Sequence, residues 1–125
     1  MKTILIVDDQ YVNRLLFKTI LSSEKLTNNI NYNIVEAVNG QESVDLVNEI
    51  NVDLIIMDIN MPVMNGIAAT KIIKEIKPNL PIIGISAFDA VSIKDSYGFD
   101  VNDFDKFMTK PVDMVTLNTI VAKLI

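Results

Sequence analysis

Charged and polar side chains follow four of the short apolar runs in this sequence. They are Asp8 and Asp9, Asp58, Ser86 and Lys110. Three carboxylates brought close together repel one another, which raises their pKa values and costs free energy. Such a cluster persists most naturally around a hard cation, and Mg²⁺ takes carboxylates together with phosphate oxygens. With a lysine and a hydroxyl beside it, the cluster is suited to handling a phosphoryl group, where catalysis is mostly positioning and charge neutralisation.

These side chains can meet only if the runs that precede them lie in one sheet. Apolar runs rich in β-branched residues alternate along the chain with segments whose apolar residues recur at helical spacing. The predicted strands are residues 3–7, 33–37, 53–57, 81–85 and 104–108, and the predicted helices are residues 10–25, 41–50, 67–77, 87–99 and 112–125. The alternation predicts an α/β fold, a doubly wound five-stranded parallel sheet with helices on both faces, in a single domain over residues 1–125. The strand order 2-1-3-4-5 is common at this size, and ligands bind at the carboxyl ends of such strands.

The helical spacing also predicts which side chains face the sheet. The predicted inward residues are Val12, Leu15, Leu16, Ile20 and Leu21 in the first helix, and Val115, Val121 and Leu124 in the last. Between the third strand and its helix, Pro62 and Gly66 are interpreted mostly as ordinary turn formers.

The composition excludes several classes of protein. The chain has no cysteine and no histidine, so thiolate metal sites, disulfide frameworks and Ser-His catalysis are ruled out. Its net charge of −5 and scattered basic residues argue against direct nucleic-acid binding. The apolar runs are far shorter than a membrane-spanning helix, and no signal peptide precedes Asp8, so a soluble cytoplasmic protein with no membrane partner is expected.

Simpler interpretations exist for each polar residue taken alone. An aspartate or serine after a strand often caps the next helix, and for any one of these residues capping is the better explanation. The first turn, Asp8-Asp9-Gln10, has no glycine. A mononucleotide-binding role is therefore disfavoured, because two carboxylates repel a bare phosphate there.

The chain resembles the receiver domain of two-component response regulators over residues 2–124. Four segments carry the resemblance: Ile4–Asp9, Asp53–Gly66, Ser86–Ala87 and Phe107–Pro111. The sequences of the first two segments are most similar to those of receivers attached to hybrid sensor kinases. The resemblance implies a flavodoxin-like fold, and it implies that a histidine kinase or a histidine phosphotransfer protein is the partner.

The resemblance also implies a role for each matching residue. Asp58 would accept a phosphoryl group from phosphohistidine. Mg²⁺ would be bound directly by Asp9, Asp58 and the backbone carbonyl of Asn60, and by Asp8 through a water. Lys110 would pair with Asp58 and then with the phosphoryl group, and Ser86 would donate a hydrogen bond to it. Phe107 stands at the aromatic switch position, so phosphorylation would shift the fourth and fifth strand–helix face, although Phe107 could equally be a plain core residue. Lys110–Pro111 would be a cis peptide.

Two features depart from the family pattern. The segment between Ser86 and Lys110 is longer than usual, and residues 100–103 are expected to form an extra loop. Phe88 stands where a polar residue is common, and we hypothesise that its bulk slows loss of the phosphoryl group.

Three functions follow from these residues. The first is a phosphorylation-driven signalling module that is not an enzyme in the ordinary sense, with no effector domain in this chain, either standing alone or cut from a longer protein. The second is a phosphohydrolase, which would need an acid where the chain has Asn60. The third is a binding module that is never phosphorylated, although no acid or lysine has been lost. Whether phosphorylation drives dimerisation is left open.

Overall fold

Five parallel strands form one sheet in a computed structural model that describes all residues from Met1 to Ile125. The strands are β1 (Lys2–Val7), β2 (Tyr32–Ala37), β3 (Leu54–Asp58), β4 (Ile82–Ser86) and β5 (Lys106–Thr109). Their order in the sheet is β2-β1-β3-β4-β5, and every neighbouring pair is parallel. The predicted fold class and strand order are therefore confirmed.

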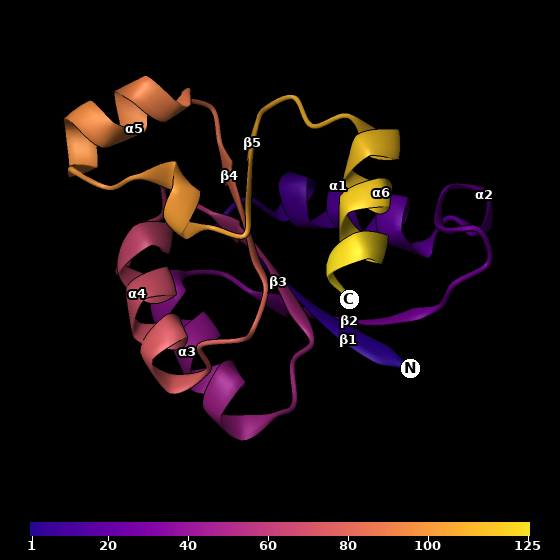
Figure 1. Cartoon of the computed structure of the whole chain (residues 1–125). Helices are drawn as coiled ribbons and strands as arrows, with labels where there is room; N and C mark the ends of the chain where they lie inside the picture. Colours follow the sequence, from indigo (N-terminus) through magenta and orange to yellow (C-terminus); the bar gives the residue numbers. More distant parts are fainter.

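Helices cover the sheet on both sides (Figure 1). They are α1 (Tyr11–Ser22), α2 (Glu24–Thr27), α3 (Gly40–Glu49), α4 (Gly66–Ile76), α5 (Ala90–Tyr97), the 3₁₀ helix η1 (Val101–Asp103) and α6 (Met114–Leu124). Helices α1 and α6 lie on one side, and α3 and α4 lie together on the other. No helix in the structure combines the length and apolarity that a membrane crossing requires.

Two apolar clusters hold the layers together. Successive strand residues point to opposite faces, so Ile4 and Ile6 pack toward α1 and α6, whereas Leu5 and Val7 pack toward α3 and α4. The central strand β3 is buried along its whole length. Burial on both faces explains why the strands read as continuous apolar runs, and it holds the carboxyl ends of β1 and β3 rigidly side by side.

The first predicted helix is wrong in its length and in the face it buries. Ser23 has an extended backbone and divides residues 10–25 into α1 and α2, because its hydroxyl caps α2 by accepting a hydrogen bond from the Leu26 amide. The residues that α1 buries are Phe17, Ile20 and Leu21. Val12, Leu15 and Leu16 are exposed, so these three inward assignments are wrong.

The carboxyl-terminal elements also differ from their predicted bounds. Asp89 caps α5, and Gly98 ends it with a left-handed backbone, so the helix is shorter than residues 87–99. Residues 101–103 form η1 where a loop was expected. Phe104 lies before β5, not within it, and its ring is buried. In α6, Val121 is buried as predicted but Val115 is exposed, because the helix turns Leu117 toward the sheet instead.

Candidate functional site

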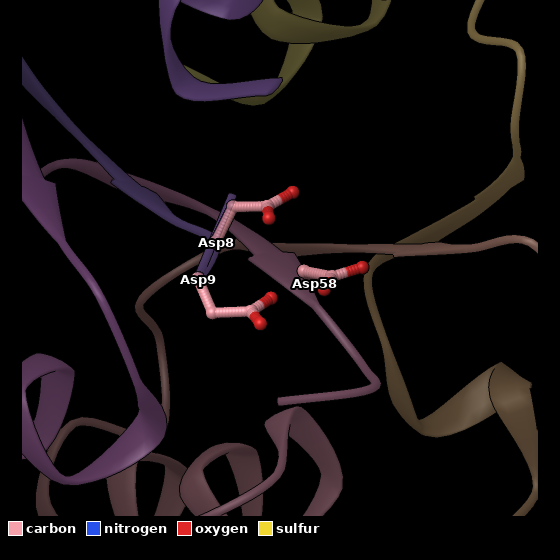
Figure 2. A group of neighbouring side chains, drawn as sticks. All are labelled: Asp8, Asp9 and Asp58. Atoms are coloured by element: carbon pink, nitrogen blue, oxygen red, sulfur yellow. The ribbon is translucent and has the colours of Figure 1, made fainter. Parts of the chain in front are cut away.

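Three carboxylates meet at the carboxyl end of the sheet. Asp8 and Asp9 directly follow β1, and Asp58 is the last residue of β3, the strand beside it. One oxygen from each lies within 4.8 Å of the others, and Figure 2 shows the three side chains together at the ends of these strands. Asp8 is fully buried and Asp58 is 5% exposed, whereas Asp9 is half-buried. The predicted acidic cluster therefore exists.

Helix capping accounts for only part of this cluster. One oxygen of Asp8, Oδ1, accepts hydrogen bonds from the Gln10 amide at 2.9 Å and from Asn13 Nδ2 at 3.5 Å. The other oxygen, Oδ2, is buried without a hydrogen-bond partner. A buried carboxylate oxygen is costly unless a cation balances it. This oxygen, with two more carboxylates beside it, fits a divalent cation that takes oxygen ligands.

Lys110 supplies the positive charge at this site. Its Nζ lies 3.2 Å from Asp58 Oδ1 and 3.7 Å from Asp8 Oδ2. The residue follows β5, its amide donates to the Ser86 carbonyl at 2.8 Å, and its bond to Pro111 is cis as predicted. One ammonium therefore faces a cluster of three carboxylates, which leaves an excess of negative charge.

The surroundings of Asp58 change its acidity. Burial raises the pKa of Asp58, from an ordinary value of 3.8 to about 6, and the negative charges of Asp8 and Asp9 act in the same direction. Lys110 opposes the shift through its charge and its hydrogen bond. Burial and repulsion thus outweigh the ion pair, and an added cation would restore the ionised form.

The loop between β3 and α4 carries the next predicted residue. The Asn60 carbonyl accepts no backbone hydrogen bond, while the neighbouring Ile59 carbonyl accepts one from Gly66. Gly66 is more than a turn former, because a Cβ there would lie 2.1 Å from the Asp58 carbonyl oxygen. Only glycine lets the start of α4 approach β3 so closely. The Asn60 carbonyl therefore has no backbone partner in this loop.

Of the two predicted switch residues, Ser86 lies at the carboxyl end of the sheet, and Phe107 lies further back, in register with Gly84. Ser86 is buried at the end of β4, and its hydroxyl accepts a hydrogen bond from the Phe88 amide at 3.0 Å. Phe107 on β5 is half-buried, and its ring stacks on that of Phe104 with centroids 6.4 Å apart. The structure thus places Ser86 at the same sheet edge and Phe107 in the adjoining aromatic packing. Phe88 is half-exposed.

Two residues near the site were missed in the sequence. Arg14 of α1 donates a hydrogen bond to the Asp8 carbonyl, and the Tyr97 hydroxyl at the end of α5 donates to the Asn60 side chain. Both contacts join residues from different elements. The helical spacing of the apolar residues in α1 carries no signal for a contact between Arg14 and the end of β1.

A hollow of about 370 Å³ lies next to Lys110. Its walls come from α1 and from the segment that follows β5: Asn13, Leu16, Phe17, Lys110, Pro111 and Val112. Leu16, which is exposed on α1, therefore borders a depression that opens beside the ammonium of the site.

Comparisons with known proteins agree with this arrangement. The sensor kinase/phosphatase LuxN of Vibrio campbellii is 43% identical over 67% of this chain, which spans 9% of LuxN. Two-component response regulator 24 of Arabidopsis thaliana is 34% identical over 98% of this chain and 83% of its own length. The crystal structure of the response regulator TrrA of Thermotoga maritima, in complex with Mg²⁺ and BeF, superposes with a TM-score of 0.81 at 30% identity, covering 100% of both chains.

The family comparison covers nearly the whole chain. A model of the response regulator receiver domain matches residues 4–122, which include all five strands from Ile4 onward and every residue of the site. The fold, the carboxylate cluster and the lysine all agree with that match. The chain belongs to the response regulator receiver domain family of two-component signalling.

Proposed function

We propose that this chain is a single receiver domain that accepts a phosphoryl group on Asp58. The observation that carries the proposal is the 3.2 Å contact between Lys110 Nζ and Asp58 Oδ1 within the cluster of three carboxylates. A carboxylate oxygen of Asp58 attacks the phosphorus of a phosphohistidine, and the P–N bond breaks. The imidazole nitrogen keeps that bond's electron pair and takes a proton from water, which leaves an aspartyl phosphate and a neutral histidine.

Lys110 and Ser86 are proposed to serve the transferred group. As negative charge passes from the Asp58 carboxylate to the phosphoryl oxygens, the Lys110 ammonium follows it, because the two lie in ion-pair contact already. The Ser86 hydroxyl becomes a donor to another phosphoryl oxygen by rotating about its side-chain bond. In the structure the same oxygen accepts a hydrogen bond from the Phe88 amide.

Mg²⁺ is the cofactor that the donor set fits. Asp9, Asp58 and the Asn60 carbonyl would hold it directly, and Asp8 would reach it through a water. When bound, the ion neutralises the carboxylates and screens the charge of the incoming phosphoryl group. TrrA, a structural neighbour, was crystallised with Mg²⁺ and BeF, which supports this assignment.

The alternative functions are less well supported. A phosphohydrolase would need a general acid two residues after Asp58, and Asn60 has no ionisable group. A binding-only module would have no need of a buried carboxylate cluster that raises the pKa of Asp58. We therefore assign the chain to signalling, with autocatalytic phosphotransfer and slow self-dephosphorylation. The half-exposed Phe88 is proposed to slow that loss by keeping water from the phosphoryl group.

The switch is proposed to involve Phe107 and the face formed by β4, α5 and β5. Movement of the Ser86 hydroxyl toward the phosphoryl group frees space at the end of β4, and Phe107 on the neighbouring strand responds. Helix α5 buries only Ile93, so little packing opposes its displacement. A shift of this face would be the signal that a downstream target reads.

The partner that delivers the phosphoryl group is proposed to be a histidine kinase or a histidine phosphotransfer protein. The exposed apolar residue Leu16 of α1 borders the hollow beside Lys110, and Val12 and Leu15 are exposed on the same helix. An apolar surface at the mouth of the site suits a helix that carries a phosphohistidine. Dimerisation and a cytoplasmic location stay predictions.

Phosphoramidate tests this proposal, because its P–N bond has the chemistry of phosphohistidine. We expect Mg²⁺-dependent phosphorylation of the parent, and chemical-shift changes in β4, α5 and β5 that Phe107→Ala reduces. Phe88→Glu is expected to shorten the lifetime of the aspartyl phosphate. A phosphorylated protein whose α5 and β5 resonances do not move would refute the proposed switch, and equal lifetimes would refute the role of Phe88.

A further inference from the structure

Arg14 joins three elements at the edge of the carboxylate site. Its Nη1 donates to the Asp8 carbonyl at 2.9 Å, and its Nε donates to Glu36 Oε1 at 3.1 Å. The side chain is only 13% exposed, although it belongs to a surface helix. Glu36 lies on β2, in register with Ile6 of β1. The guanidinium therefore bridges α1, the end of β1 and the edge strand β2.

These contacts fix the peptide group between Asp8 and Asp9. The Asp8 amide donates to the Ala37 carbonyl at 3.1 Å, so the backbone is held on its amide side by β2 and on its carbonyl side by Arg14. The Asp9 side chain has just one contact of its own, from Gln10 Nε2 at 3.4 Å. Because a peptide group is planar, fixing the Asp8 carbonyl also orients the backbone from which the Asp9 side chain extends.

The charge of Arg14 is balanced away from the site. Glu36 accepts from Arg14 through Oε1 and from Lys18 through Oε2, the latter at 3.2 Å. Burial acts to raise the pKa of Glu36, but the hydrogen bonds from Lys18 and Arg14 outweigh burial and lower it. Glu36 is therefore ionised at neutral pH and holds the guanidinium toward β2, so that it meets the Asp8 backbone and not the carboxylates.

We propose that Arg14 is a positioning residue that orients Asp9 for Mg²⁺ binding and so for phosphoryl transfer. This rests on the proposed function, since it needs a Mg²⁺ site at Asp9 and Asp58. The proposal predicts an effect opposite to that of simple electrostatics. Removing a positive charge close to a cation site strengthens cation binding if charge alone matters. Removing a residue that positions a metal ligand weakens binding.

Isothermal titration with Mg²⁺ separates the two accounts. We expect Arg14→Gln to weaken Mg²⁺ binding about tenfold, the lower end of the effect seen when a group that orients a metal ligand is lost. Lys18→Gln is the matched control. It removes a positive charge that is paired with Glu36, as Arg14→Gln does, but it leaves the hydrogen bond from Arg14 to the Asp8 carbonyl in place. The Mg²⁺ affinity of Lys18→Gln is expected to equal or exceed that of the parent. Arg14→Gln binding as tightly as Lys18→Gln would overturn the proposal.

Arg14→Lys keeps the charge and guards against loss of the fold in Arg14→Gln. A single ammonium does not reproduce the two-pronged contact to the Asp8 carbonyl and Glu36, so weaker Mg²⁺ binding is expected here too. The metal-free ¹⁵N resonance of Asp9 should move in both Arg14 variants and not in Lys18→Gln. Unchanged affinity and an unmoved resonance in Arg14→Lys would contradict positioning. A parent that binds no Mg²⁺ would instead refute the proposed function.

Discussion

Replacing Asp58 with asparagine should stabilise the metal-free protein at neutral pH. Asparagine has nearly the same shape as the protonated carboxyl group, but it carries no charge. In the parent, burial and the charges of Asp8 and Asp9 oppose ionisation of Asp58. The substitution removes that penalty, and it leaves Lys110 with Asp8 as a partner at 3.7 Å.

The size of the effect follows from the two protonation equilibria. The pKa of Asp58 is about 6 in the folded protein against an ordinary value of 3.8. At 1.36 kcal/mol per pH unit, ionisation therefore costs the folded state about 3 kcal/mol. The folded protein binds the proton more tightly than the unfolded chain does. The stability due to protonated Asp58 is thus fully present below about pH 4 and is lost as the pH rises through 6.

Urea denaturation in the presence of EDTA measures this difference. At pH 7.5 we expect the free energy of unfolding of Asp58→Asn to exceed that of the parent by about 3 kcal/mol, and at pH 4 we expect the two to converge. Asp45→Asn, on the exposed surface of α3, controls for the loss of one negative charge. If Asp58→Asn raises the free energy of unfolding equally at both pH values, the argument from burial and repulsion is refuted. An increase as large in Asp45→Asn would refute it too.

Three further substitutions test the backbone around the site by urea denaturation. Gly66→Ala should destabilise the fold by about 3 kcal/mol, because its Cβ would lie 2.1 Å from the Asp58 carbonyl oxygen; a loss well under 1 kcal/mol would contradict that close approach. Val63→Gly should stabilise it by about 1 kcal/mol, since Val63 has a φ of 69° that disfavours a β-branched residue; a destabilised variant would contradict that backbone strain. Asp105→Ala should cost about 2 kcal/mol, because the carboxylate accepts a hydrogen bond from the buried Ile82 amide at 2.7 Å; no loss would show that the amide finds another partner.

The sheet and the acidic cluster could be predicted from local pattern. A strand buried on both faces is mostly apolar, so β1, β3 and β4 can be recognised in the sequence as short apolar runs between more polar segments. Parallel strands deliver their following residues to one edge, which is why the spacing of Asp8, Asp58 and Lys110 was sufficient to place them together.

The errors arose where contacts between distant segments decide the outcome. Leu15 and Leu16 do lie in a helix, but the side of α1 that packs on the sheet carries Phe17 and Leu21. Likewise, Gly66 is required by its approach to the Asp58 carbonyl, which no local pattern reveals. The contact of Arg14 with the Asp8 backbone is of the same kind.

Intact mass after incubation with acetyl phosphate tests the central claim most directly. The parent should gain a single phosphoryl group with Mg²⁺ present and none with EDTA, and Asp58→Asn should gain none in either condition. This result follows because the carboxylates need a cation before a phosphoryl donor can approach Asp58. An adduct on Asp58→Asn, or no adduct on a folded parent with Mg²⁺, would contradict the assignment of Asp58 as the phosphoacceptor.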